Sequence, residues 1–173
     1  VTGAGAGADV AGAGVAGGIV LAGRGDDLSD VSLGATIVEG SVARGAGAGA
    51  GIHATAVAGS LAIAGALLTG NDGAGLHAID IGRLSVTGSR IAGNSVGVRL
   101  VETPAGPGPG ADLVLGGSPA AGNRLAGNAE GALVLVNATH STVSTPDVVG
   151  TYNDWGTAWA PAIEDAIRHR PDD

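Results

Sequence analysis

The fold is decided by residues 61–81, whose sequence is LAIAGALLTGNDGAGLHAIDI. This stretch begins with apolar residues at alternate positions, passes a glycine, reaches a Gly-Asn pair and ends in a second alternating apolar segment. The same order is found in residues 84–102 (LSVTGSRIAGNSVGVRLVE) and 113–137 (LVLGGSPAAGNRLAGNAEGALVLVN). Alternating apolar residues are typical of strands, and a unit that recurs along the chain is typical of a solenoid.

The unit recurs after about 22–24 residues once two excursions are set aside. Leu61 and Leu84 are 23 residues apart, whereas Leu84 and Leu113 are 29 apart because residues 104–110 (PAGPGPG) lie between them. Residues 45–50 form a second Gly/Ala-rich excursion. Glycine and β-branched residues disfavour helix in the repeats. The sequence therefore predicts an all-β fold, a right-handed parallel β-helix with about five coils of about 22–24 residues.

Stacking of these coils predicts which side chains point inward and which stand at a corner. The Gly-Asn pairs place Asn71, Asn94 and Asn128 at one equivalent corner. An amide there can bond the turn backbone of its own and the neighbouring coil, so a structural role is expected. The expected inward columns are Ile52, Leu76 and Val98; Ala54, Ala78 and Leu100; Leu61, Leu84 and Leu113; and Ile63, Val86 and Leu115.

The composition restricts the function. The chain has 34 glycines, 45% hydrophobic and 2% aromatic residues, and no Phe, Met or Cys, so a narrow, regular interior must be filled by aliphatic side chains. A net charge of −8 argues against nucleic acid and anionic membrane surfaces as partners. Residues 1–23 contain eight glycines and no basic start, so neither membrane insertion nor a signal peptide is expected. Because the first residue is Val1, we expect a longer parent protein.

The C-terminal segment differs from the repeats. Tyr152, Trp155 and Trp159 are the only aromatic residues, and all lie in residues 151–159. Residues 162–170 (AIEDAIRHR) place Ala162, Ile163, Ala166 and Ile167 on one helical face, which predicts a short amphipathic capping helix. We therefore expect one domain over 1–173. Residues 1–30 would be a first coil or N-terminal edge, 31–150 regular coils, and 151–173 an aromatic cap in which Trp155 is structural.

Two motifs resemble a known family. The pattern I-x-G-N-x-x-G-V-x-L in residues 89–100, echoed in residues 66–78, is similar to the repeat of right-handed parallel β-helix proteins of the pectate-lyase-like superfamily. The ending YNDWGTAWAPAIEDAI, residues 152–167, resembles the terminus of bacterial proteins of this kind that lie on or outside the cell. The resemblance implies a secreted or cell-surface location and a polysaccharide or surface protein as partner.

One outward column carries the candidate chemistry. His53, His77 and Arg99 are expected at the same outward position of three coils, about 4.8 Å apart. Asp80 and Glu102 are level with each other three residues on. Cations for an acidic sugar, together with carboxylates for proton transfer, would suit a lyase or glycoside hydrolase. The alternative is an ordinary solvated sheet face. No group of residues has transition-metal spacing, so no metal or cofactor is expected.

Three functions follow from these patterns. The preferred hypothesis is a non-catalytic surface β-helix that serves as a rigid structural module or binds a glycan or protein, because regular coils explain most patterned residues. The second is a polysaccharide lyase or glycoside hydrolase that uses the candidate residues named above. The third is a unit that assembles end to end through an uncapped N-terminus.

Overall fold

The computed structural model describes residues 18–22, 30–41, 49–103, 112–136, 148–157 and 159–170. Strands make up 56% of these residues, and every strand pairing among them is parallel. The prediction of a mostly β chain with parallel strands is therefore confirmed. The elements are β1 (Ile19–Ala22), β2 (Asp30–Gly34), β3 (Ile37–Glu39), β4 (Ile52–Ala64), β5 (Leu67–Thr69), β6 (Ala74–Thr87), β7 (Arg90–Ala92), β8 (Val96–Val101), β9 (Asp112–Leu115), β10 (Gly131–Val136), β11 (Val148–Val149), α1 (Ala160–Ala166) and β12 (Ile167–Arg170).

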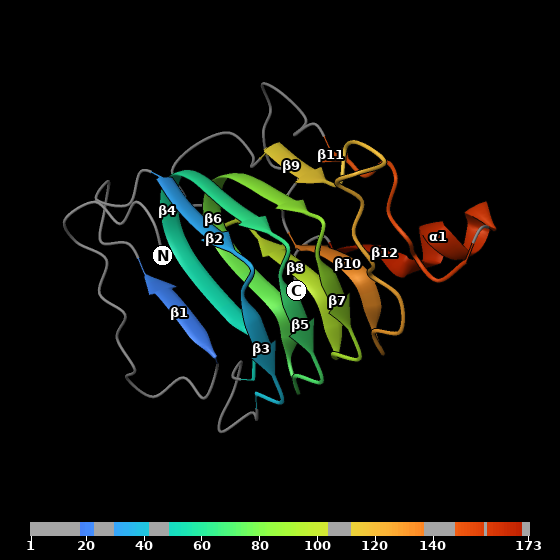
Figure 1. Cartoon of the computed structure of the whole chain (residues 1–173), viewed down its shortest axis with the longest axis horizontal. Coiled ribbons are helices and arrows are strands. Elements are labelled where there is room, and N and C mark those ends of the chain that lie inside the picture. The colour runs from blue at the N-terminus through green and yellow to red at the C-terminus, as the bar shows by residue number, and fades with distance from the viewer. Residues whose placement is uncertain are drawn as a thin grey trace.

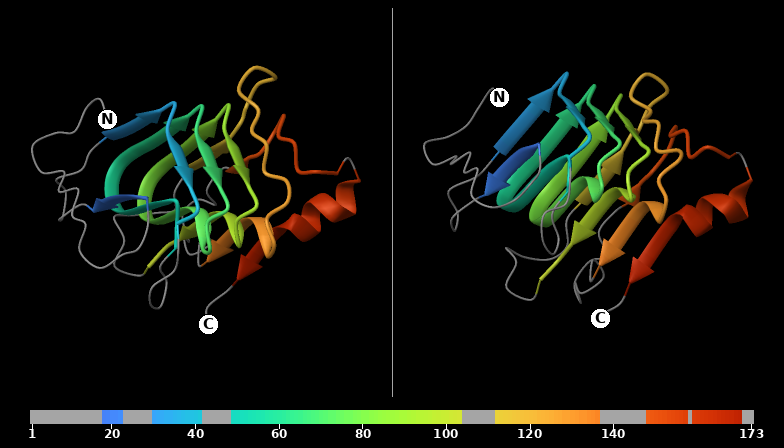
Figure 2. Two further views of the ribbon diagram at one scale, coloured as in Figure 1. Left: turned by 60° about the horizontal axis from the view of Figure 1, so that its bottom comes forward. Right: turned by 90° about the horizontal axis from the view of Figure 1, so that it is seen from below.

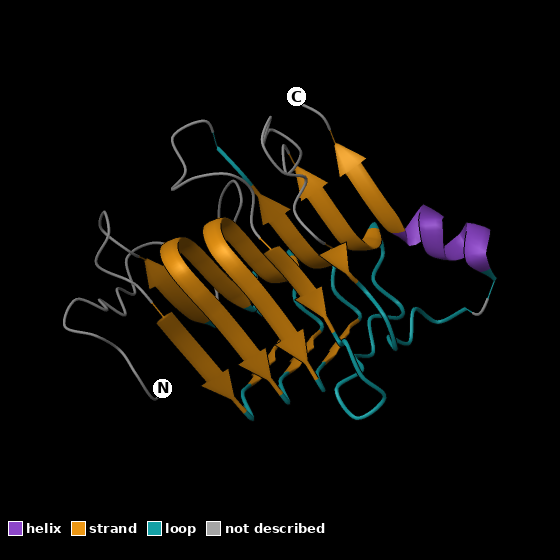
Figure 3. Cartoon of the chain, turned by 90° about the horizontal axis from the view of Figure 1, so that it is seen from above, coloured by secondary structure: helices purple, strands orange, loops and turns teal. Residues whose placement is uncertain are grey.

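The strands form two parallel sheets (Figures 1 and 2). The larger sheet has the order β1-β4-β6-β8-β10-β12, and it also holds β2 against β4, β9 against β6 and β11 against β9. The smaller sheet has the order β3-β5-β7. Seen from above, the strands lie side by side along the molecule, with the N-terminal strands at one end and α1 at the other (Figure 3). Neighbours in a sheet are therefore successive passes of the chain.

Strands β4 and β6 are long and bent, and each contributes to two faces. Both halves of β4 pair with the matching halves of β6. The first halves also pair with β1 and β8, and the second halves with β2 and β9. At the bend Ala56 and Asp80 have φ of 54° and 53°, a conformation that L-residues rarely adopt. Where two separate strands meet in the predicted repeat, the structure has one continuous strand that turns a corner.

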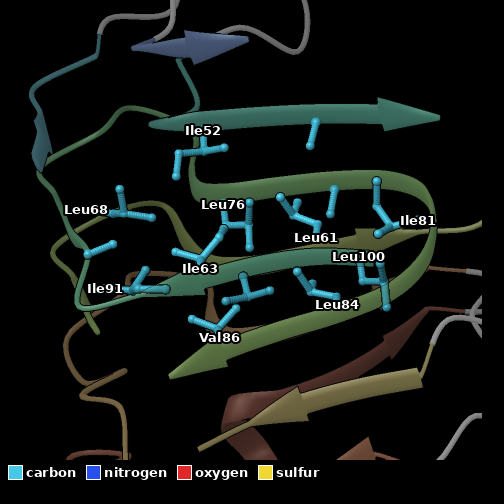
Figure 4. Close-up of a cluster of buried hydrophobic side chains, with 14 of the residues drawn as sticks. Ile52, Leu61, Ile63, Leu68, Leu76, Ile81, Leu84, Val86, Ile91 and Leu100 are labelled. Carbon is cyan, nitrogen blue, oxygen red and sulfur yellow. The ribbon is translucent and has the colours of Figure 1, made fainter. Parts of the chain in front are cut away.

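The apolar core lies between these faces. Ile52 pairs with Leu76 and Leu76 with Val98, while Leu61 pairs with Leu84 and Leu84 with Leu113. All of these side chains are 0% exposed. Figure 4 shows Ile52, Leu76, Leu61 and Leu84 among the buried side chains between the strands. The register confirms the predicted inward columns, because alternate residues of each strand face the same side.

The sequence pattern marked only two strands in each repeat and located no strand of the third, short face of the predicted three-sided coil. Strands β3, β5 and β7 have three residues each, and the central residue of each, Val38, Leu68 and Ile91, points into the core. Isolated parallel bridges continue this face from Arg90 to Arg124 and from Arg124 to Asp154. Three residues are too few for alternation to mark a strand in the sequence.

The aromatic segment is a further repeat and not a separate cap. Asp154 bridges to Arg124, and Asn153 accepts hydrogen bonds from Asn123, so residues 153–154 match 123–124 of the preceding unit. Trp155 is half-buried and packs against the core, whereas Tyr152 and Trp159 are 62% and 68% exposed. Two of the three rings of the predicted aromatic cap are therefore exposed. Only Trp155 covers apolar surface.

The predicted C-terminal helix is also too long. Helix α1 ends at Ala166 and buries none of its residues, and Ile167–Arg170 form β12. Strand β12 pairs with β10, with Ile167 opposite Leu133 and Arg168 opposite Val134. The open edge of β10 offers hydrogen bonds that a solvent-exposed last helical turn cannot match, and β-branched Ile167 suits a strand.

Several expectations lie partly or wholly outside the described residues. Residues 104–110, 45–48 and 1–17 are among these, so the excursions and the first part of the N-terminal edge are not described. Ala50, placed in an excursion by its sequence, is instead buried, with 2% exposure. Among the described residues, no helix is long and apolar enough to cross a membrane.

Candidate functional site

The predicted column of His53, His77 and Arg99 forms across three adjacent strands. His53 on β4 pairs with His77 on β6, and His77 pairs with Arg99 on β8. The two imidazole rings meet edge to face, with centroids 5.0 Å apart and an interplanar angle of 72°. Val20 precedes this row and Val134 follows it. The row is therefore cationic or imidazole-bearing at three positions and apolar at both ends.

The column is half-buried and is not the solvated face that its sequence suggests. His53 Nδ1 and Arg99 Nε are buried atoms without a hydrogen-bond partner. Apolar neighbours explain part of this burial, since Val134 beside Arg99 is 1% exposed and packs with Ala74 and Val96. Buried nitrogen atoms that lack a partner are rare in proteins, so this row is the most unusual polar feature among the described residues.

Burial also changes the protonation of the two histidines. Desolvation, followed by the charges of His53 and Arg99, lowers the pKa of His77 to about 4. Desolvation lowers the pKa of His53 as well. Because an imidazole out of water resists a positive charge, both rings are neutral at pH 7. A neutral imidazole can accept a proton or bind a metal ion, but it offers no charge to an acidic sugar.

We expect the stability of the protein to fall between pH 6.5 and pH 4. The unfolded chain protonates His77 near pH 6.5, whereas the folded protein resists protonation until about pH 4. The stability associated with the neutral ring is therefore complete above pH 6.5 and is lost as the pH falls from 6.5 to about 4. With allowance for partial exposure, the loss from pH 7 to pH 5 should be about 1 kcal/mol. Urea unfolding at these two pH values measures it. The loss should be smaller in His77→Gln, and an equal loss in that variant would contradict this assignment.

The Asp80 carboxylate of the candidate site holds the backbone of Thr103. Asp80 accepts a hydrogen bond from the Thr103 backbone N–H on Oδ1 and one from the Thr103 hydroxyl on Oδ2, each 2.7 Å long. Glu102 donates its backbone N–H to the carbonyl of Val136 over 3.0 Å. Asp80 therefore stabilises the corner at which it sits, where its φ is positive.

The Gly-Asn corner forms a hydrogen-bonded ladder. The Asn71 side chain donates to Asn94 Oδ1 over 2.8 Å, and Asn94 donates to Asn128 Oδ1 over 3.1 Å. The backbone N–H groups of Asn71 and Asn94 donate to the same two oxygens. Asn71 and Asn94 are 1% and 3% exposed. These amides satisfy buried backbone groups, which is a structural role.

A second ladder was not predicted. The Ser89 hydroxyl accepts from the Ala66 N–H, Asn123 Oδ1 accepts from the Ser89 N–H, and Asn153 Oδ1 accepts from both nitrogens of Asn123. It runs along the opposite end of the short face from the first ladder. The Gly-Asn pair at residues 122–123 is its one signal in the sequence. Ser89 and the Tyr152–Asn153 pair conceal the periodicity.

No group of three or more metal-binding side chains gathers in the part of the chain that the structure describes. Comparison with known protein families, curated proteins and solved structures finds no match for this chain. The site must therefore be interpreted from its own geometry.

Proposed function

We propose that the chain is a right-handed parallel β-helix. Two of its faces come from the halves of β4 and β6 and the third from β3, β5 and β7, which supports a three-sided coil. Paired residues such as Asn71 and Asn94 are 23 residues apart, the length of one coil. Crossovers between parallel strands of one sheet are right-handed in about 98% of cases, which supports the handedness.

This β-helix serves as a rigid, non-catalytic module of a secreted or cell-surface protein, either as a spacer or as a binding surface for a glycan or another protein. The proposal rests on the two hydrogen bonds that the Asp80 carboxylate accepts from Thr103. Both of its oxygens are occupied by Thr103, so the carboxylate best placed in sequence for proton transfer is used to hold a corner. The two polar ladders likewise use their amides to join coils.

A second candidate function rests on the histidine row. A neutral His77 with a strongly lowered pKa, next to buried nitrogen atoms without partners, is the kind of group found in active sites. A polysaccharide lyase or hydrolase would use this ring as a base and Arg99 to hold an acidic sugar. No carboxylate hydrogen-bonds to His53 or His77 in the described residues, which makes this the weaker candidate.

Incubation of the protein with acidic polysaccharides separates the two functions. We expect no reducing ends and no unsaturated products above the buffer level, in the wild type as in His77→Ala and Asp80→Asn. The Asp80→Asn substitution should instead lower the free energy of unfolding, because an amide in place of the carboxylate can accept only one of the two hydrogen bonds from Thr103. Turnover in the wild type that His77→Ala abolishes would overturn the non-catalytic proposal. A glycan array on the same samples tests binding.

A further inference from the structure

We propose that His53 and His77 form a binding site for one divalent transition-metal ion, of the class of Zn²⁺, Ni²⁺ or Cu²⁺. This inference does not depend on the proposed function. It rests on the juxtaposition of two imidazoles that are 24 positions apart in the chain and directly opposite each other in the sheet. That separation is far from any metal-binding sequence motif, and the strand register brings the pair together as the repeat predicted.

The distance between the rings suits a shared ion. Their centroids are 5.0 Å apart and their planes are inclined by 72°. With metal–nitrogen bonds of about 2.0–2.1 Å and a tetrahedral angle, two imidazoles on one ion have centroids roughly 5 Å apart. The separation of the two rings therefore fits the binding of one ion by both imidazoles.

The chemical state of the rings also suits a metal. Metal binding requires a neutral imidazole, and burial keeps both rings neutral at pH 7. His53 Nδ1 is buried and lacks a hydrogen-bond partner, so a metal ion would supply the interaction that this atom is missing. The rings lie on the central strands β4 and β6, whose pairing holds them in place and reduces the entropy lost on binding.

The surroundings predict the kind of site. No third metal-binding side chain joins the pair among the described residues, so water would complete the coordination and binding should be weaker than at a structural zinc site. Imidazole prefers zinc, copper and nickel to magnesium and calcium, which favour oxygen. Arg99, next in the row, opposes any cation. Its removal should therefore strengthen binding, a response that a nonspecific surface site elsewhere would not show.

Calorimetric titration of the untagged protein at pH 7.5 with ZnCl₂ and with NiCl₂ tests the site. We expect one ion per chain in the wild type. Binding should weaken about tenfold or more in His53→Ala and in His77→Ala, because each loses the chelating partner. It should tighten about tenfold in Arg99→Leu, because a neighbouring positive charge is removed. His140→Ala and His169→Ala, the two other histidines, are the matched controls and should bind like the wild type.

A spectroscopic measurement covers the case in which a variant does not fold. Electron paramagnetic resonance of the wild type with one equivalent of Cu²⁺ should show coupling to two imidazole nitrogens. MgCl₂ should give no heat of binding. Absence of Zn²⁺ and Ni²⁺ binding by the wild type, Cu²⁺ coupling to a single nitrogen, or equal affinity in a folded His53→Ala variant would overturn the proposal.

Discussion

Replacing Asn94 by alanine should destabilise the protein by about 4 kcal/mol. Its side chain accepts from both nitrogens of Asn71 and donates to the Leu68 carbonyl and to Asn128 Oδ1. The substitution leaves both buried nitrogens of Asn71 without their acceptor, and each such group costs about 1–3 kcal/mol. Since whole domains are stable by only about 5–15 kcal/mol, the loss would be a large share of the total. Urea unfolding monitored by circular dichroism measures it.

Ser95→Ala is the matched control for this prediction. Ser95 follows Asn94 directly, and its hydroxyl donates to Glu130 Oε1 over 2.7 Å at the exposed surface. A solvated hydrogen bond of this kind contributes little, so the variant should stay within about 0.5 kcal/mol of the wild type. If Asn94→Ala changed stability no more than Ser95→Ala does, the ladder would not be the structural element described above.

Gly75→Ala should destabilise the protein by about 3 kcal/mol, because no space exists for a methyl group. A Cβ atom at this position would lie 2.5 Å from Ile91 Cγ2, 2.9 Å from Asn94 Nδ2 and 3.0 Å from the Gly97 carbonyl oxygen. Ile91 is fully buried, so neither the core nor the ladder can yield without loss of contacts. The same unfolding measurement gives the change in free energy.

Gly34→Ala provides the comparison in another strand. A Cβ atom at Gly34 would meet nothing within 4 Å, and Gly34 is exposed. Alanine restricts the unfolded chain more than glycine does, so this variant should be about 0.5 kcal/mol more stable than the wild type. Equal effects of the two substitutions would show that close approach of the coils at Gly75 does not decide its identity.

The parallel pairing and the core columns could be predicted because they depend on spacing alone. Leu61 and Leu84 are separated by one repeat, and Ile63 lies on the same strand as Leu61. These strands are long enough to show alternation, and the register places the three residues as expected. The corner asparagines could be predicted because each comes directly after a glycine in its repeat. Where the period is constant, one coil predicts the next.

The remaining features depend on contacts that spacing does not encode. The second ladder uses Ser89 in one repeat and Asn123 in the next, so its members share a hydrogen-bonding role but not a single residue type. Ile167 satisfies a helical pattern equally well, and only the open edge of β10 favours a strand there. The burial of His53 and His77 depends on their surroundings in space, so spacing alone does not predict it.

Disulfide trapping tests the central claim, the stacking of coils in register, most directly. The chain has no cysteine, so introduced pairs are free of competing thiols. Glu39 pairs with Thr69 and Thr69 with Ala92 on the short face, where paired Cα atoms lie about 4.8 Å apart, within disulfide range. Cysteines at 39 and 69, or at 69 and 92, should therefore cross-link on mild oxidation. Cysteines at 39 and 92, two coils apart at about 9.6 Å, should stay reduced. Cross-linking of the 39–92 pair would contradict the stacked coils. A failure of both the 39–69 and the 69–92 pairs to cross-link would contradict them as well.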